Sequence, residues 1–154
     1  YWSVLLLLAL TLSGCSSFAR LSDGRRFERT INEIRQTQGG TVLSAGPFDS
    51  PAGSFGLFYM RRGQDCYTGL VDLRNGGASV SSGGGSCGSG GFTASSFGGQ
   101  TLVVGREDGA TAVTLDLGDG TELKATLFEG FWYLLLPTAD PEPYLAGADI
   151  HVTR

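Results

Sequence analysis

The sequence predicts an all-β domain, and three observations support this fold class. From Thr41 onward, β-branched and aromatic residues form short runs that are separated by glycine, proline and aspartate. Two pairs of these runs align as hairpins with matching apolar positions, and the spacing of the runs is typical of a sandwich or a small barrel. Since 154 residues suffice for one hydrophobic core, we expect residues 41–154 to form one domain.

The clearest hairpin is predicted around the three-residue loop Gly118-Asp119-Gly120, where Gly120 can adopt the left-handed backbone conformation that such loops need. The polar residues between the apolar ones then point to the opposite face, which is typical of a half-buried antiparallel pair. The expected cross-strand neighbours are Leu117 with Thr121, Leu115 with Leu123, Val113 with Ala125, and Thr111 with Leu127.

A second hairpin is predicted between residues 55–61 and 66–72, with its turn at residues 62–65. Leu57 would lie opposite Leu70 and Met60 opposite Tyr67, but the pattern leaves open which face is buried. We favour an immunoglobulin-like antiparallel β-sandwich over a small β-barrel. The further predicted strands are residues 41–44, 101–104, 131–136 and 149–153.

Residues 75–99 are predicted to form a surface loop. They include ten glycines and seven serines, a composition that offers little side chain to bury and favours a flexible chain.

A short helix is predicted over residues 20–38, with Asp23 as a cap and Gly39-Gly40 as its end. Phe27, Ile31 and Ile34 form its apolar stripe. We favour a linker helix packed on the domain, because three apolar residues bury little area. The alternative is a segment lying on anionic lipid headgroups, since residues 20–35 carry five arginines and three acids.

Residues 1–12 form an uncharged, mostly apolar run. A membrane-spanning helix needs about 20 such residues, whereas the core of a signal peptide needs roughly 7–15. The run is followed by Leu12-Ser13-Gly14-Cys15, which resembles the lipobox of bacterial lipoproteins: an aliphatic residue, two small residues and a cysteine. We expect residues 1–14 to be a lipoprotein signal peptide that is incomplete at its N-terminus.

This resemblance implies that the Cys15 thiol receives a diacylglyceryl group and that the chain is cleaved between Gly14 and Cys15. Residues 15–40 would then be a lipidated N-terminus and helical linker, with membrane lipid as the partner of Cys15. Ser16 follows the cysteine instead of an aspartate. The family pattern therefore implies the outer membrane in a two-membrane bacterium, and the outer face of the plasma membrane in a one-membrane bacterium.

The chain has three cysteines, an odd number that the implied lipidation of Cys15 resolves. Cys66 and Cys87 then remain as a disulfide pair in an oxidising compartment, and closing that loop would contribute about 3 kcal/mol. The alternative is two free thiols. We expect no metal site, because the chain has one histidine and no further cysteine as soft ligands.

No catalytic residue or cofactor site is predicted. Gly84–Gly88 match a nucleophile elbow but lack its flanking strand and helix. Gly83, Gly85 and Gly88 match the spacing of a dinucleotide-binding loop but lack the βαβ unit that this motif needs. His151 is interpreted as a strand-surface residue. The aromatic residues are interpreted as core in preference to a ligand platform; these are Phe128, Phe131, Trp132 and Tyr133.

Residues 36–154 hold six basic and twelve acidic residues, a net charge of −6. This excess of acid argues against nucleic-acid binding, which needs a clustered basic surface. The expectation is a lipid-anchored extracytoplasmic protein with a β-rich binding or structural module, whose partner is an envelope protein or glycan. The alternative is a surface hydrolase of envelope glycan or peptide with an unrecognised carboxylate site.

Overall fold

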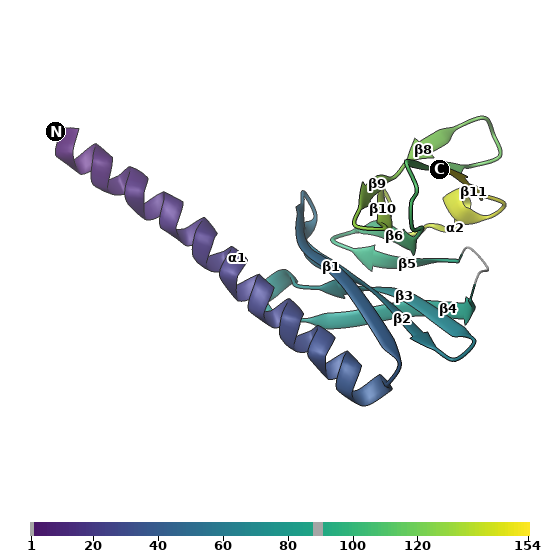
Figure 1. Ribbon diagram of the computed structural model, residues 1–154. Coiled ribbons are helices and arrows are strands. Elements are labelled where there is room, and N and C mark those ends of the chain that lie inside the picture. Colours follow the sequence, from purple (N-terminus) through teal and green to yellow (C-terminus); the bar gives the residue numbers. More distant parts are fainter. Residues whose placement is uncertain (1, 88–90) are drawn as a thin grey trace.

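The computed structural model describes the backbone of residues 2–87 and 91–154, with side chains described from residue 18 onward in these ranges. A long helix, α1 (Trp2–Gln38), precedes three antiparallel sheets that lie one above the other (Figure 1). Within the described residues, no helix is both long and apolar enough to cross a bilayer.

The first sheet has the order β1-β2-β3-β4, the second β5-β6-β10-β9, and the third β11-β7-β8. A 3-10 turn, η1 (Arg74–Gly76), follows β3, and a single helical turn, α2 (Glu142–Leu145), precedes β11. The strands are β1 (Thr41–Ser50), β2 (Gly53–Arg62), β3 (Asp65–Asp72), β4 (Ser79–Ser86), β5 (Phe92–Phe97), β6 (Gln100–Arg106), β7 (Ala112–Asp116), β8 (Glu122–Lys124), β9 (Thr126–Phe128), β10 (Phe131–Leu136) and β11 (Asp149–Thr153).

The expectation of an antiparallel, mostly β domain is confirmed. Every strand pair is antiparallel, and the first two sheets pack face to face across a shared apolar core that includes Phe55 and Leu57 from β2 and Leu102 and Phe131 from β6 and β10. The first sheet is a meander in which each strand pairs with the next along the chain. An immunoglobulin sandwich has Greek-key connections instead, so this sheet differs from that topology.

The strand β2 of the first sheet is buried on both of its faces. Phe58 and Met60 of β2 pack against Phe27 and Ile31 of α1, whereas Phe55, on the opposite face of the strand, belongs to the core between the first two sheets. A strand covered on both sides reads as a continuous apolar run instead of an alternating one. This is why the sequence leaves the buried face of this hairpin open.

The second half of α1 packs on the first sheet as expected, and the helix ends at Gln38 before Gly39 and Gly40, both with positive φ. The prediction that Asp23 caps this helix is wrong. The helix continues through Asp23 to Trp2, and the Asp23 carboxylate pairs with Arg26 one turn later. Figure 1 shows the N-terminal half of α1 extending away from the sheets.

The predicted register is confirmed for the hairpin of β2 and β3, and near the turn for the hairpin of β7 and β8. Leu57 pairs with Leu70 and Met60 with Tyr67. Around the second turn, Leu115 pairs with Leu123, and Gly120 has a φ of 88°.

The expected pairing of Thr111 with Leu127 is wrong. The Thr111 N–H donates to the Thr153 carbonyl on β11, whereas Leu127 pairs with Trp132 of the second sheet. The chain leaves the third sheet after Lys124 and enters the second at Thr126, so the predicted hairpin is interrupted there.

The prediction of a surface loop over residues 75–99 is wrong for β4 and β5, which both lie in this segment. β4 pairs with β3 along its whole length, from Asp65–Ser86 to Asp72–Ser79. Composition misleads here because the order comes from backbone hydrogen bonds and close strand contact. At Gly83, an added Cβ would lie 2.8 Å from the Thr93 hydroxyl of β5.

A charged pair at the end of β3 ties the first sheet to the second. The Arg74 side chain donates to the Asp72 carboxylate at 2.5–3.0 Å, and its guanidinium lies 4.3 Å from the centre of the Phe97 ring on β5. The hydrogen bond from the Arg74 side chain, together with its backbone N–H, lowers the pKa of Asp72 from 3.8. The same pairing raises the pKa of Arg74.

We expect Asp72→Asn to lower the free energy of unfolding by about 1 kcal/mol at pH 7, because a part-buried ion pair and its hydrogen bonds are weakened. A carboxyl whose folded pKa is lowered stabilises the fold above its unfolded pKa of about 4, and this contribution is lost as the pH falls through the folded pKa. The difference between wild type and variant should therefore shrink in urea unfolding at pH 3. The exposed Asp149→Asn is the control, and an equal loss in both variants would contradict the account.

Candidate functional site

A polar cleft of about 350 Å³ opens between the edges of the first two sheets. One wall comes from β2, β3 and β4 of the first sheet, and the other from β5, the end of β6 and the turn after it. The lining residues are Tyr59, Cys66, Thr68, Gly83, Gly84, Gly85, Ser86, Gly91, Phe92, Arg106, Glu107, Asp108 and Arg154.

Arg106 is the central cation of this cleft. Its guanidinium carbon lies 4.7 Å from the centre of the Tyr59 ring and 5.8 Å from that of Phe131, within the range of cation–π attraction. Its Nη2 donates to both carboxylate oxygens of Asp108 at 2.7 and 2.5 Å. Its Nε is buried and has no hydrogen-bond partner among the described residues, so one donor at the cleft wall is unused.

The two acidic residues of the cleft are both held by arginines. The Glu107 carboxylate accepts from Arg154 Nη2 at 3.0 Å, and Asp108 is the partner of Arg106. Residues 107–109 form a turn, in which the Ala110 N–H donates to the Glu107 carbonyl. Each of these carboxylates is thus paired with a guanidinium, so the positive and negative charges at the cleft balance one another.

Three consecutive glycines of β4, residues 83–85, line the cleft. At Gly84, an added Cβ would lie 2.2 Å from the Tyr67 ring and 2.8 Å from the Cys66 carbonyl oxygen. Larger residues would therefore push β4 off β3. These glycines offer peptide groups instead of side chains to the cleft. Together with Arg106 and Tyr59, they can accommodate a small polar ligand.

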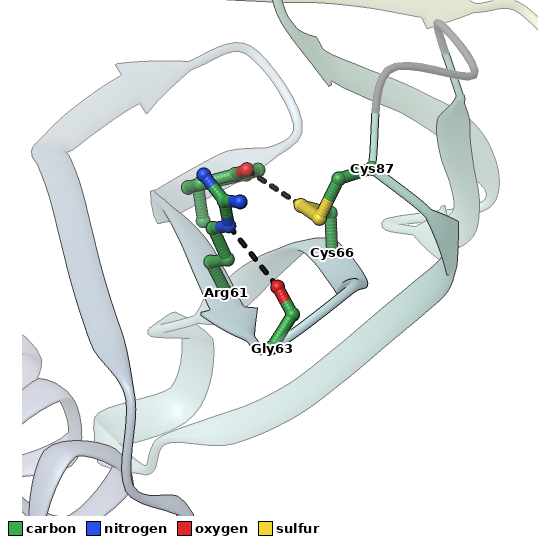
Figure 2. Close-up of a disulfide and its surroundings, with 5 residues drawn as sticks. Arg61, Gly63, Cys66 and Cys87 are labelled. Atoms are coloured by element: carbon green, nitrogen blue, oxygen red, sulfur yellow. Dashed lines mark hydrogen bonds between the residues drawn. A yellow bond between two sulfur atoms is a disulfide. The ribbon is translucent and has the colours of Figure 1, made fainter.

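A disulfide joins Cys66 of β3, which lines the cleft, to Cys87 directly after β4 (Figure 2). This is the disulfide that we expect from the sequence. The Tyr59 hydroxyl donates to Cys66 Sγ at 2.7 Å, and the Cys87 N–H donates to the Gln64 carbonyl. Nearby, Arg61 Nε donates to the Gly63 carbonyl across the turn between β2 and β3 (Figure 2). Ordering the glycine-rich β4 costs much backbone entropy. The disulfide and the Cys87 hydrogen bond hold the C-terminal end of this strand at the turn between β2 and β3.

We expect Cys87→Ala to lower the free energy of unfolding by about 3 kcal/mol, the entropy of closing a loop of this length. Urea unfolding of the oxidised chain measures this loss, with oxidised Cys15→Ala, which keeps the pair, as the control. Intact mass of the Cys15→Ala chain should rise by two hydrogens on reduction. An unchanged mass would show free thiols and sink this prediction.

The other residues singled out from the sequence lie apart from the cleft. His151 is an exposed residue of β11, with its Nε2 3.6 Å from Asp116 Oδ2 on β7. Phe131 and Trp132 are buried, which confirms the core interpretation for them, whereas Phe128 is 44% exposed and meets Phe48 edge-on. Among the residues with described side chains, no three potential ligands gather as a metal site.

The lipobox prediction falls outside the described side chains. Gly14 and Cys15 lie within α1, but the structure describes only the backbone of this part of the helix. The sequence missed the cleft because its charged residues come from distant segments. Arg154 and Glu107 are 47 positions apart, and no local pattern signals their contact.

The chain matches no model of a known protein family, no curated protein and no solved structure.

Proposed function

We propose that this protein is a lipid-anchored protein on the extracytoplasmic side of a bacterial membrane, and that its stacked β-sheets are a binding or structural module of the cell envelope. The observation that carries the proposal is the Leu12-Ser13-Gly14-Cys15 segment directly after an apolar run. Cleavage before Cys15 would place the lipidated residue at the new N-terminus.

The position of α1 supports this assignment. Among the side chains of α1 that the structure describes, Phe27 is the first that is buried against the sheets, and it lies twelve residues after Cys15. At 1.5 Å per helical residue, the intervening segment is about 18 Å long. This length would keep the domain close to the membrane and still outside it.

The cleft supports the binding role of the module. Its guanidinium, aromatic ring and exposed peptide groups are suited to polar groups such as those of an envelope glycan or a peptide. The immunoglobulin-like form of the sandwich receives no support from the meander of the first sheet, so the module is proposed only as a β-sandwich.

We expect Cys15→Ala to abolish incorporation of labelled palmitate when the complete gene is expressed in a bacterium, and to release the protein from the membrane fraction. The physical reason is that the Cys15 thiol is the acceptor of the lipid. Cys87→Ala is the matched control, because it removes a different thiol and should keep the label. Label retained in Cys15→Ala would refute the anchor.

A surface hydrolase is the second candidate, favoured by the two carboxylates of Glu107 and Asp108 at one cleft. A screen of the chain against envelope glycans and peptides tests it, with Glu107→Gln and Asp108→Asn as variants. Turnover that one of these substitutions abolishes would replace the binding role by a catalytic one. Absence of turnover together with measurable ligand binding supports the module.

A further inference from the structure

Residues 18–31 of α1 have two opposite faces. Phe27 and Ile31 pack on the first sheet. Phe18 lies nine residues before Phe27, which is about 180° around a helix at 100° per residue. Leu21, Arg25 and Arg29 follow Phe18 at spacings of three or four and share its side of the helix. We call these four residues the outer face of α1.

The outer face exposes two large apolar side chains. Phe18 is 75% exposed and Leu21 61% exposed, and together with Arg25 and Arg29 they border a shallow hollow on the helix. Figure 1 shows the sheets packed along one side of α1 only. Adjacent exposed apolar residues are typical of an interaction surface.

The charges of this segment indicate the nature of the partner. Arg20 and Arg26 are paired with Asp49 and Asp23. Arg25 and Arg29 are exposed, one helical turn apart, and neither has an ion-pair partner among the described side chains. Glu28 is an exposed acid beside them, and residues 18–29 keep a net charge of +2.

We propose that the outer face of α1 rests on an anionic lipid surface, with Phe18 and Leu21 in the headgroup region and Arg25 and Arg29 on lipid phosphates. The inference builds on the proposed anchor, because Cys15 lies three residues before Phe18 and would hold this face at the membrane. An amphipathic helix with apolar and basic residues on one side binds in this way. The helix would then lie between the bilayer and the first sheet.

The charge distribution of the whole chain favours the same orientation. Residues 36–154 have a net charge of −6, so an anionic surface repels the domain while it attracts the outer face. The lipid on Cys15 fixes where the chain is held, and the outer face fixes which side of it is turned to the membrane.

The test uses the full chain with Cys15→Ala, so that no lipid is attached, and vesicles of phosphatidylcholine with or without phosphatidylglycerol. The readout is the ratio of binding to anionic over neutral vesicles at 0.1 M NaCl, because the apolar residues 2–12 bind both kinds. Arg25→Glu with Arg29→Glu should lower this ratio by at least about 30-fold, since each lost arginine costs about 1 kcal/mol and each new glutamate is repelled by the anionic lipid. The control is Arg62→Glu with Lys124→Glu, an equal charge change at exposed positions elsewhere.

A ratio that is unchanged in the outer-face variant, or that falls equally in the control, would overturn the inference. Phe18→Ala with Leu21→Ala should weaken binding to both kinds of vesicle. This measurement does not depend on lipidation. A failure of palmitate labelling with the expected vesicle result would remove the anchor alone, and normal labelling with an unchanged ratio would remove the membrane-contacting face alone.

Discussion

Trp132→Ala is expected to lower the free energy of unfolding by about 3–5 kcal/mol, the cost of removing a large aromatic side chain from a core. Trp132 is 2% exposed and packs in the core between the second and third sheets with Val103, Val113 and Leu136. Its ring lies against Gly105, where an added Cβ would be 2.3 Å away. Alanine at this position would leave a cavity between the second and third sheets, because the strands cannot move close enough to fill the space.

Urea unfolding followed by circular dichroism measures the loss at Trp132. Phe128→Ala is the matched control, because Phe128 lies on the adjacent strand but is largely exposed. We expect it to cost about 1 kcal/mol, mainly through the lost contact with Phe48. A similar cost for both variants would contradict the layered core.

Phe27→Ala is expected to lower the free energy of unfolding by a comparable amount, about 3–5 kcal/mol, because Phe27 is the large aromatic side chain that seats α1 on the first sheet. Hydrogen exchange of the α1 amides should rise in the same variant, since the helix loses its main contact. The control is Phe18→Ala, a residue of the same helix on the outer face, which should change stability by less than about 0.5 kcal/mol. Equal effects at Phe27 and Phe18 would refute the docking of the helix.

Gly56 provides a check on the same contact. A Cβ at Gly56 would lie 2.2 Å from the Phe27 ring, so Gly56→Val should destabilise the chain while Gly77→Val, at a position with open space, should not. In the Phe27→Ala background the penalty at Gly56 should largely disappear, because the ring that clashes is gone.

The parts of the fold that were predicted correctly are those governed by local patterns. Alternating apolar residues and a glycine turn specify the register of Leu115 with Leu123 and of Leu57 with Leu70. The stripe of Phe27 and Ile31 identifies the helix that packs on the sheet.

The parts that were missed depend on contacts between distant segments. β4 is ordered by its ladder to β3 and by the disulfide at Cys87, neither of which its glycine and serine content reveals. The helix α1 on one side and the second sheet on the other bury both faces of β2, which removes the alternation that would mark an inner face. The cleft around Arg106 lies between the first two sheets, and its charged residues belong to no sequence motif.

The central claim, lipidation at Cys15, is tested most directly by mass spectrometry of the N-terminal peptide from the protein isolated from bacterial membranes. We expect a peptide that begins at Cys15 and carries a diacylglyceryl group on its sulfur, with residues 1–14 removed. A peptide that continues through Gly14, or an unmodified Cys15 thiol, would contradict this expectation.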